Sequence, residues 1–424
     1  MVAAAPLPVD TGLYDALAVT LELVLAFYLV AGLARLAARK GVSGLALPLA
    51  CALGVRAAIA IIVDGVPALA GTRGIDEIFF ARQGRQLAAG TASLGEVPAA
   101  LLGNLHIWWM ALQGKLIGAS GDLYLRVGHA ALAVAGIAVL AVTVGQLAGA
   151  ARGRLAAWLL AFEPSSAFFS TILHKEAPMF LGEALVVAGC VRMYTRRDGW
   201  SVAIMVAGLG VAAGARPYAA AAMAVACGLT LAHAGLRRMG HGGVRRPVLA
   251  AIVVVVALTG LAVGPSFSTV LGGIQRAQNA NASDRQSNLP LPPVDYTNVT
   301  SVVTNLPGRA FDVLSRPLPW EAANTSQQLG VIGTVVAWTL IAAVMFLFVR
   351  RPKLALEHLV PVAYILGSLL LVYSLSTGNA GTGFRYRSHL VVLLIITLAV
   401  VAPRGVGTWR PARSGSQRLP TAVR

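Results

Sequence analysis

Apolar runs of about 20 residues recur along the whole of this 424-residue chain, and they limit its fold more than any other feature. A helix needs a run of about that length to cross the hydrocarbon core of a bilayer. Charged residues make up only 12% of the chain, against about 25% in a typical soluble domain. Since no domain-sized polar segment remains between the runs, we predict an all-α, polytopic membrane protein.

The runs predict about 11 transmembrane helices in a single transmembrane domain, residues 1–402, followed by a basic tail at residues 403–424. The expected spans are residues 13–35, 45–64, 123–148, 155–173, 177–194, 199–215, 217–235, 248–267, 329–349, 355–375 and 387–402. A further apolar run, residues 97–119, is interrupted by polar side chains and contains Trp108 and Trp109. Because tryptophan is enriched at membrane interfaces, we expect this run to form a surface helix and not another span.

Clusters of basic residues set the expected orientation. They are Arg35/Arg39/Lys40, Arg152/Arg154, Arg192/Arg196/Arg197, Arg237/Arg238/Arg245/Arg246, Arg350/Arg351/Lys353 and the tail from Arg404. They follow alternate spans, and cytoplasmic loops carry an excess of Lys and Arg. We therefore expect the N-terminus outside and the C-terminus in the cytoplasm. The formal charge of +17 then reflects topology, and we expect no nucleic-acid partner.

This orientation predicts two long outer segments, residues 65–122 and 268–328, and a short outer loop at residues 376–387. The first of them carries adjacent carboxylates, Asp76 and Glu77, at the start of an amphipathic stretch. An outer carboxylate beside cations could take a proton from an acceptor hydroxyl, but Asp76 is equally suited to cap a helix. Because neighbouring helix positions point about 100° apart, the two are not expected to share one role, and Asp76 is the stronger catalytic candidate.

Basic residues outside the clusters gather at the predicted outer helix ends. They are Lys175, Arg216, Arg385 and Arg387. Together they could hold an anionic group, since guanidinium groups match phosphate oxygens as a bidentate fork. In an extended loop, residues two apart such as Arg385 and Arg387 would point the same way. The alternative for these two arginines is that they anchor the helix end at lipid headgroups.

Four charged residues fall inside predicted spans: Glu22, Arg56, Glu163 and Glu183. Charges in lipid are costly and should face the protein interior. We expect Arg56 to pair with Glu22 or Glu163, and a proton or ion relay is the alternative.

Several segments together resemble GT-C glycosyltransferases, of the protein mannosyltransferase or lipid A aminoarabinose transferase type. Gly74-Ile-Asp-Glu-Ile-Phe-Phe-Ala-Arg-Gln-Gly84 is similar to their first outer loop, which carries an acidic residue. The segment from Glu163 to Glu176 is similar to one joining two of their spans, and Arg385-Tyr-Arg-Ser-His resembles the entry into their terminal helix.

The resemblance implies a sugar donor linked to polyprenyl phosphate, used on the outer face of the bacterial cytoplasmic membrane with a cell-envelope glycan, lipid or protein as acceptor. The excess of Arg over Lys, 30 to 4, also points to a GC-rich bacterial genome. Asp76 would be the catalytic carboxylate, and the cations would bind the donor phosphate. The expected acceptor groove includes Trp320, Glu321 and Tyr386. No metal ligands are assigned, and a divalent metal stays open as a cofactor.

Two other functions fit the same sequence. The first is a polymerase or ligase of diphosphate-linked oligosaccharides, in which arginine chemistry would dominate. The second is a flippase or transporter with Arg56, Glu163 and Glu183 along its path, although polar residues in the spans are sparse.

Overall fold

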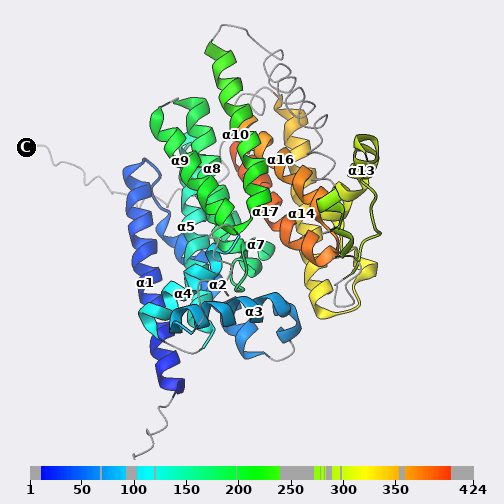
Figure 1. The fold of residues 1–424 in the computed structure, drawn as a ribbon. Helices are drawn as coiled ribbons and strands as arrows, with labels where there is room; N and C mark the ends of the chain where they lie inside the picture. The colour runs from blue at the N-terminus through cyan, green and yellow to red at the C-terminus, as the bar shows by residue number, and fades with distance from the viewer. Residues whose placement is uncertain are drawn as a thin grey trace, which may run out of the picture.

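The computed structural model describes residues 11–66, 69–91, 103–118, 121–196, 198–238, 272–276, 278–280, 282, 289–296, 298–352 and 359–402. The predicted span at residues 248–267 and the basic tail at 403–424 lie outside this part of the chain. Most of the described residues are helical, and they form a bundle of long helices that other helices cross at one end (Figure 1).

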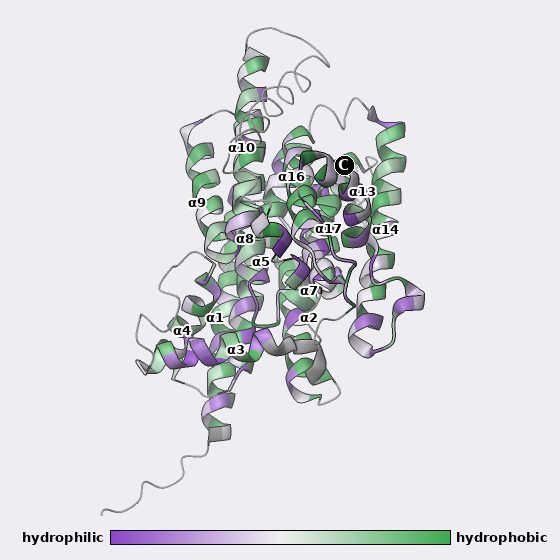
Figure 2. Ribbon diagram, turned by 45° about the vertical axis from the view of Figure 1, so that its right-hand side comes forward, coloured by the Kyte–Doolittle hydropathy of each residue, from purple (hydrophilic) through white to green (hydrophobic). Residues whose placement is uncertain are grey.

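Seven helices in the described part are long and apolar enough to cross a membrane, which confirms a multi-pass helical protein. They are α1 (Thr11–Arg39), α2 (Ala46–Gly65), α5 (Leu123–Ala148), α8 (Glu176–Thr195), α10 (Pro217–Arg238), α14 (Thr325–Arg350) and α17 (Ala380–Val401). Two shorter apolar helices, α9 (Gly199–Ala215) and α16 (Val360–Ser376), match two further predicted spans. Hydrophobic residues predominate along the long helices, as expected for segments in contact with lipid (Figure 2).

The predicted span at residues 155–173 is not one helix. It is divided into α6 (Ala150–Phe162) and the short α7 (Pro164–Phe169). The carboxylate of Glu163 accepts hydrogen bonds from the backbone N–H groups of Ser165 and Ser166, and Pro164 occupies the first position of α7. An N-cap followed by proline starts a new helix, which explains the break.

Small residues bring α8 and α9 into close contact. A Cβ atom on Gly182 would lie 2.7 Å from the backbone nitrogen of Ala212, and one on Gly208 would lie 2.7 Å from that of Val186. Helices in lipid gain stability from such close backbone approach, because no hydrophobic effect drives them together. These contacts lie beside the main buried core, which also includes most of α5 and α17.

The helices α3 (Ala70–Ala89) and α4 (Leu105–Ile117) lie across one end of the bundle, roughly perpendicular to the long helices (Figures 1 and 2). They pack closely, since a Cβ on Gly84 would lie 2.8 Å from the Cβ of Met110. At 13 residues, α4 is too short to span a bilayer. The prediction that residues 97–119 contain a helix that is not a span is therefore confirmed for the described residues.

Basic clusters meet at the other end of the bundle. Arg152 donates to the carbonyl oxygens of Val400 and Ala402 at 2.7 and 2.6 Å, and Arg154 donates to that of Ser43 at 3.3 Å. These contacts join the start of α6 to the end of α17 and to the turn after α1. The first two basic clusters thus share one end of the bundle, which is the cytoplasmic end in the predicted topology.

Two segments that were expected to be loops contain helices. In the outer segment at residues 268–328, α13 (Val299–Ser315) begins at a capping box formed by Asn298 and Ser301, and the short η2 (Pro319–Glu321) follows it. In the predicted loop at residues 376–387, Asn379 caps α17 by accepting from the backbone N–H of Thr382 at 2.8 Å. Asn and Ser are unfavourable inside helices, because their side chains hydrogen-bond nearby backbone groups, but they are favourable at helix starts. Composition alone therefore did not reveal these two helix starts.

The expected ion pair of Arg56 is absent from the described residues. Arg56 instead donates to the hydroxyl of Ser170 at 3.0 Å and to the carbonyl oxygen of Ala52 at 3.2 Å. Glu22 accepts from the side-chain amide of Gln113 at 2.9 Å, and Glu163 caps α7. Backbone carbonyl and hydroxyl groups are therefore the hydrogen-bonding partners of this buried guanidinium.

Candidate functional site

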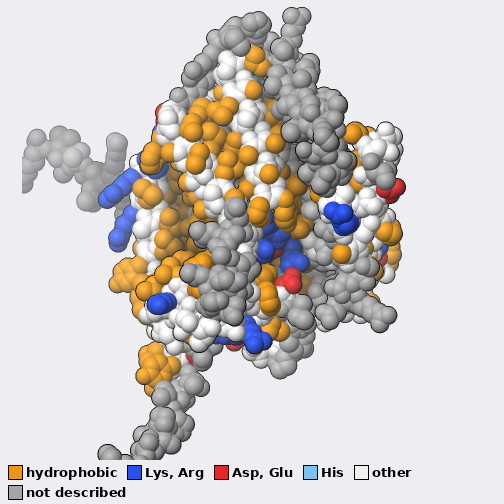
Figure 3. All heavy atoms as spheres, viewed as in Figure 1, with side chains coloured by type: hydrophobic (Ala, Val, Ile, Leu, Met, Phe, Trp, Pro, Cys, Tyr) orange, Lys and Arg blue, Asp and Glu red, His pale blue; other side chains and the backbone are white. Residues whose placement is uncertain are grey.

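Four segments that are distant in the sequence surround a pocket of about 230 Å³. They are the start of α3, the turn between α7 and α8, the junction of α9 and α10, and the first turns of α17. The lining residues are Asp76, Phe80, His174, Lys175, Glu176, Ala215, Arg216, Pro217, Tyr218, Arg385 and Tyr386. In Figure 3, basic side chains lie beside an acidic one in a recess above α3.

Asp76 reaches the pocket because of a break inside α3. Gly74 has φ of 72° and ψ of 155°, so the helical path restarts after it and places Asp76 in the first turn. Glycine adopts this left-handed conformation without the steric cost that a side chain would add. The Asp76 side chain is 54% exposed, and its carboxylate lies 3.6 Å from a guanidinium nitrogen of Arg385.

Glu77 lies on the other face of α3. Its side chain is fully buried in an ion pair with Arg126 of α5, whose guanidinium also lies 3.6 Å from the carboxylate of Asp64. The two adjacent carboxylates thus have different surroundings, as the helical angle between them predicted. Asp76 faces the pocket, and Glu77 holds α3 against α5.

Arg385 and Arg216 reach the pocket from different elements, the first turns of α17 and the junction of α9 and α10. Arg385 lies 3.2 Å from Nδ1 of His174, in addition to its contact with Asp76. Arg216 forms an ion pair with Glu176 and donates to the hydroxyl of Tyr218 at 2.9 Å. The Arg216 guanidinium is therefore held by an ion pair and a hydrogen bond, whereas the contacts of Arg385 with Asp76, His174 and Thr382 are longer, at 3.2–3.6 Å.

Two tyrosines complete the wall next to Arg216. The hydroxyl of Tyr218 donates to that of Tyr386 at 2.8 Å, and the Arg216 guanidinium lies 4.7 Å from the centre of the Tyr386 ring. The Tyr373 ring also stacks on Tyr386, with ring centres 4.4 Å apart. Tyr386 was predicted to line an acceptor groove, and it lies in this pocket beside the cations.

Lys175 is the pocket cation whose charge is least neutralised by an ion pair or hydrogen bond. In the part of the chain that the structure describes, no carboxylate or hydrogen-bond acceptor pairs with its ammonium group, which lies 5.5 Å from the centre of the Phe80 ring. Burial, followed by the charge of Arg216, lowers the pKa of Lys175. An ammonium group held in this way gains from any anion that enters the pocket.

The balance of charge in the pocket is positive. The three cations Lys175, Arg216 and Arg385 face the two carboxylates Asp76 and Glu176, which leaves one positive charge. In a partly buried site, such an imbalance favours an anionic ligand of one negative charge.

The structure does not bring every predicted site residue to this pocket. Arg387 is fully buried and donates to the carbonyl oxygens of Leu314, Arg316 and Gly330 at 3.2, 3.1 and 3.1 Å. Its three contacts join the end of α13 to α14. Because α17 is already helical at this point, Arg385 and Arg387 point to different sides instead of the same side.

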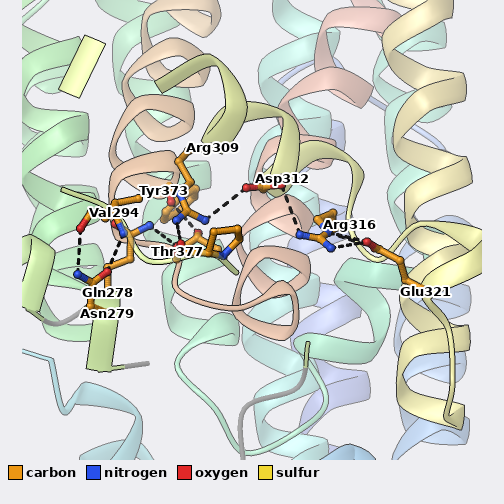
Figure 4. Close-up of polar contacts among 10 residues, drawn as sticks. Gln278, Asn279, Val294, Arg309, Asp312, Arg316, Glu321, Tyr373 and Thr377 are labelled. Atoms are coloured by element: carbon orange, nitrogen blue, oxygen red, sulfur yellow. Dashed lines mark hydrogen bonds and ion pairs between the residues drawn. The ribbon is translucent and has the colours of Figure 1, made fainter. Parts of the chain in front are cut away.

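The two residues predicted for the acceptor groove in the second outer segment also lie outside the pocket. Glu321 forms an ion pair with Arg316, which lowers the pKa of the Glu321 carboxyl, whereas Trp320 is 78% exposed. Figure 4 shows Asp312 between Arg309 and Arg316, at 3.4 and 3.8 Å from their guanidinium nitrogens. This network fixes the end of α13 next to η2.

Three polar residues of the pocket, His174, Glu176 and Tyr218, were not among the site residues predicted from the sequence. The sequence Arg216-Pro217-Tyr218 could have indicated Tyr218. It lies between two apolar runs, and its tyrosine hydroxyl follows two residues after a predicted phosphate-binding arginine. Among the described residues, no group of three or more His, Cys, Asp or Glu side chains could hold a metal ion.

No family model matches this chain, and neither a curated protein nor a solved structure matches it. The geometry of the pocket is therefore the basis for the function proposed below.

Proposed function

We propose that this protein is a membrane glycosyltransferase of GT-C type, which transfers a sugar from a polyprenyl-phosphate carrier to a cell-envelope glycan, lipid or protein at the outer face of the bacterial cytoplasmic membrane. The observation that supports it best is the meeting of Asp76 with Lys175, Arg216 and Arg385 around one pocket. A carboxylate and several cations are the groups that this reaction needs within one site.

The charge of the pocket favours a monophosphate carrier. A sugar linked to polyprenyl phosphate carries one negative charge on its phosphodiester, which equals the one positive charge left in the pocket. A diphosphate-linked donor carries two, and would leave the occupied site negative. The charge balance thus argues for the first candidate over the polymerase or ligase that uses diphosphate-linked oligosaccharides.

The position of the pocket also suits a donor with a lipid chain. The pocket lies at the ends of the long apolar helices α8, α10 and α17, next to the two helices that cross the bundle. A phosphate held there would leave its polyprenyl chain beside the apolar helices. The carrier would then remain in the bilayer during the reaction.

The proposed step uses Asp76 as the general base. Its carboxylate accepts the proton of the acceptor hydroxyl as the hydroxyl oxygen bonds to the anomeric carbon of the sugar. The bond from that carbon to the phosphate oxygen breaks, and polyprenyl phosphate leaves with the electron pair. Lys175 and Arg385 stabilise the charge that develops on the leaving phosphate, and Arg216 fixes the other side of the group.

A binding and turnover experiment tests this proposal. The purified protein in lipid nanodiscs is titrated with a labelled polyprenyl-phosphate hexose, and transfer to a membrane-glycan extract is then measured. Lys175→Gln and Arg385→Gln should each weaken donor binding by about tenfold or more, which is typical for loss of a charged hydrogen-bond donor. Asp76→Asn should retain donor binding and lose transfer.

The matched control is Lys115→Gln, which removes an exposed lysine from α4 near the same end of the bundle but outside the pocket. It should behave as the unmodified protein. Full transfer activity in Asp76→Asn would remove the carboxylate from the mechanism. Tighter binding of a diphosphate-linked donor than of the monophosphate-linked one would favour the polymerase or ligase instead.

A further inference from the structure

A second hollow, which we call the basic groove, lies between α1, α5, α8 and α9. Its volume is about 410 Å³, within the range of about 300–1,000 Å³ that is common for small-molecule sites. Glu176 at the first residue of α8 lines the pocket, whereas Arg196 just after its last residue lines the basic groove. Since a 20-residue helix is about 30 Å long, the two sites lie about a bilayer core apart.

The basic groove is polar at its mouth and apolar in its depth. Lys40, Gln146 and Arg196 lie at the ends of α1, α5 and α8, where these helices meet the turns. Two to three turns further along α1 and α8, roughly 10–16 Å away, the lining residues are apolar, as at Leu33 and Leu185. A ligand that fills this groove therefore has a polar end and an apolar end.

The mouth of the groove is positively charged. Arg192 is held by Asp198, with Nε 3.0 Å from Oδ1, so its charge is compensated. Lys40 and Arg196 also line the groove, and no carboxylate pairs with either of them within the described residues. Two uncompensated cations thus lie above an apolar groove, and three of the helices that form it, α1, α5 and α8, are long enough to span a bilayer.

A tryptophan marks the level of the mouth. Trp200, in the first turn of α9, lines the groove and is 67% exposed. Exposed tryptophan side chains favour the interface between headgroups and acyl chains. In Figure 3, Lys and Arg side chains gather around the upper end of α1, beside a hydrophobic surface. The charged mouth is therefore at headgroup level and the apolar depth at acyl-chain level.

We propose that the basic groove binds one anionic phospholipid of the leaflet at this end of the bundle. One acyl chain lies along Leu33 and Leu185, and the phosphate lies between Lys40 and Arg196. The apolar depth favours this ligand over a soluble phosphate, and the two free cations favour it over a zwitterionic phospholipid. The site is separate from the pocket and does not depend on the proposed glycosyl transfer.

Native mass spectrometry of the full-length protein in detergent tests this proposal, with phosphatidylglycerol and phosphatidylcholine added as probes. The protein should bind one phosphatidylglycerol in preference to phosphatidylcholine. The double variant Lys40→Gln/Arg196→Gln should lose affinity for phosphatidylglycerol by about 25-fold, since each basic residue contributes about fivefold at an anionic lipid surface. Ala188→Phe, which fills the groove and keeps its charges, should also weaken binding.

The matched control is Arg351→Gln, which removes a charge at the end of α14, outside the groove. It should leave phosphatidylglycerol binding unchanged. An equal loss in Arg351→Gln would overturn the proposal, because the effect would then be general surface charge. Equal binding of phosphatidylcholine, unchanged binding in Ala188→Phe, or tighter binding of polyprenyl phosphate than of phosphatidylglycerol would each overturn it as well.

Discussion

Replacing Glu77 by Ala should strongly destabilise the protein, whereas the same replacement of its neighbour Asp76 should not. Glu77 and Arg126 form an ion pair in which both side chains are fully buried. Removal of Glu77 leaves the guanidinium buried without its main counter-charge. Loss of one partner of a buried ion pair costs about 3–5 kcal/mol.

The surroundings of Arg126 place the expected value at the lower end of that range. Asp64 lies 3.6 Å from Nε of Arg126 and is 35% exposed, so it offsets part of the lost attraction. We therefore expect Glu77→Ala to reduce the free energy of unfolding by about 3 kcal/mol, or more than a hundredfold in the equilibrium constant. Asp76 is largely exposed, and its long ion pair with Arg385 should contribute less than about 1 kcal/mol.

Equilibrium unfolding in mixed micelles, with increasing fractions of sodium dodecyl sulfate, measures both values. Asp76→Ala is the matched control, since it removes a carboxylate one residue away on the same helix. The double variant Glu77→Met/Arg126→Met should be more stable than Glu77→Ala alone, because it removes the unpaired charge. A loss below about 1 kcal/mol for Glu77→Ala would refute the structural role assigned to this pair.

Three further predictions concern other parts of the bundle. Burial and the charge of Arg216 lower the pKa of Lys175, so its ammonium group loses its charge at a lower pH than an exposed lysine does. The affinity for the donor should therefore fall with rising pH in the unmodified protein but stay level in Lys175→Arg. Identical pH profiles in binding titrations of the two proteins would contradict this. Arg387→Met should lower the free energy of unfolding in mixed micelles by about 3 kcal/mol, since three carbonyl oxygens lose their hydrogen-bond donor. It should nevertheless weaken binding of the sugar donor less than Arg385→Met does. Gly208→Ala should lower the free energy of unfolding, measured in the same way, by about 1–3 kcal/mol, because its Cβ would lie 2.8 Å from the carbonyl oxygen of Gly182. An unchanged stability would argue against the close packing of α8 and α9.

The fold class followed from the sequence because the bilayer imposes a local rule. A span needs about 20 consecutive apolar residues, so length and composition were enough to predict the seven long helices. The same local rule failed at Glu163, where an N-cap and Pro164 divide the apolar run into two helices. It also missed α13, whose start depends on the side-chain contacts of Asn298 and not on hydropathy.

The sequence by itself determined a multi-pass helical protein, a carboxylate pair whose members diverge, and a set of cations at helix ends. Only the tertiary structure decided which of these meet. Tyr218 and Tyr386 are 168 residues apart, and Arg385 and His174 are 211 apart, yet each pair is in contact. It also separated Arg385 from Arg387, because the helical phase of α17 turns one toward the pocket and the other toward backbone carbonyl oxygens. The physical reason is that hydropathy acts along the chain, whereas a binding site depends on side-chain directions that are fixed only when the helices pack.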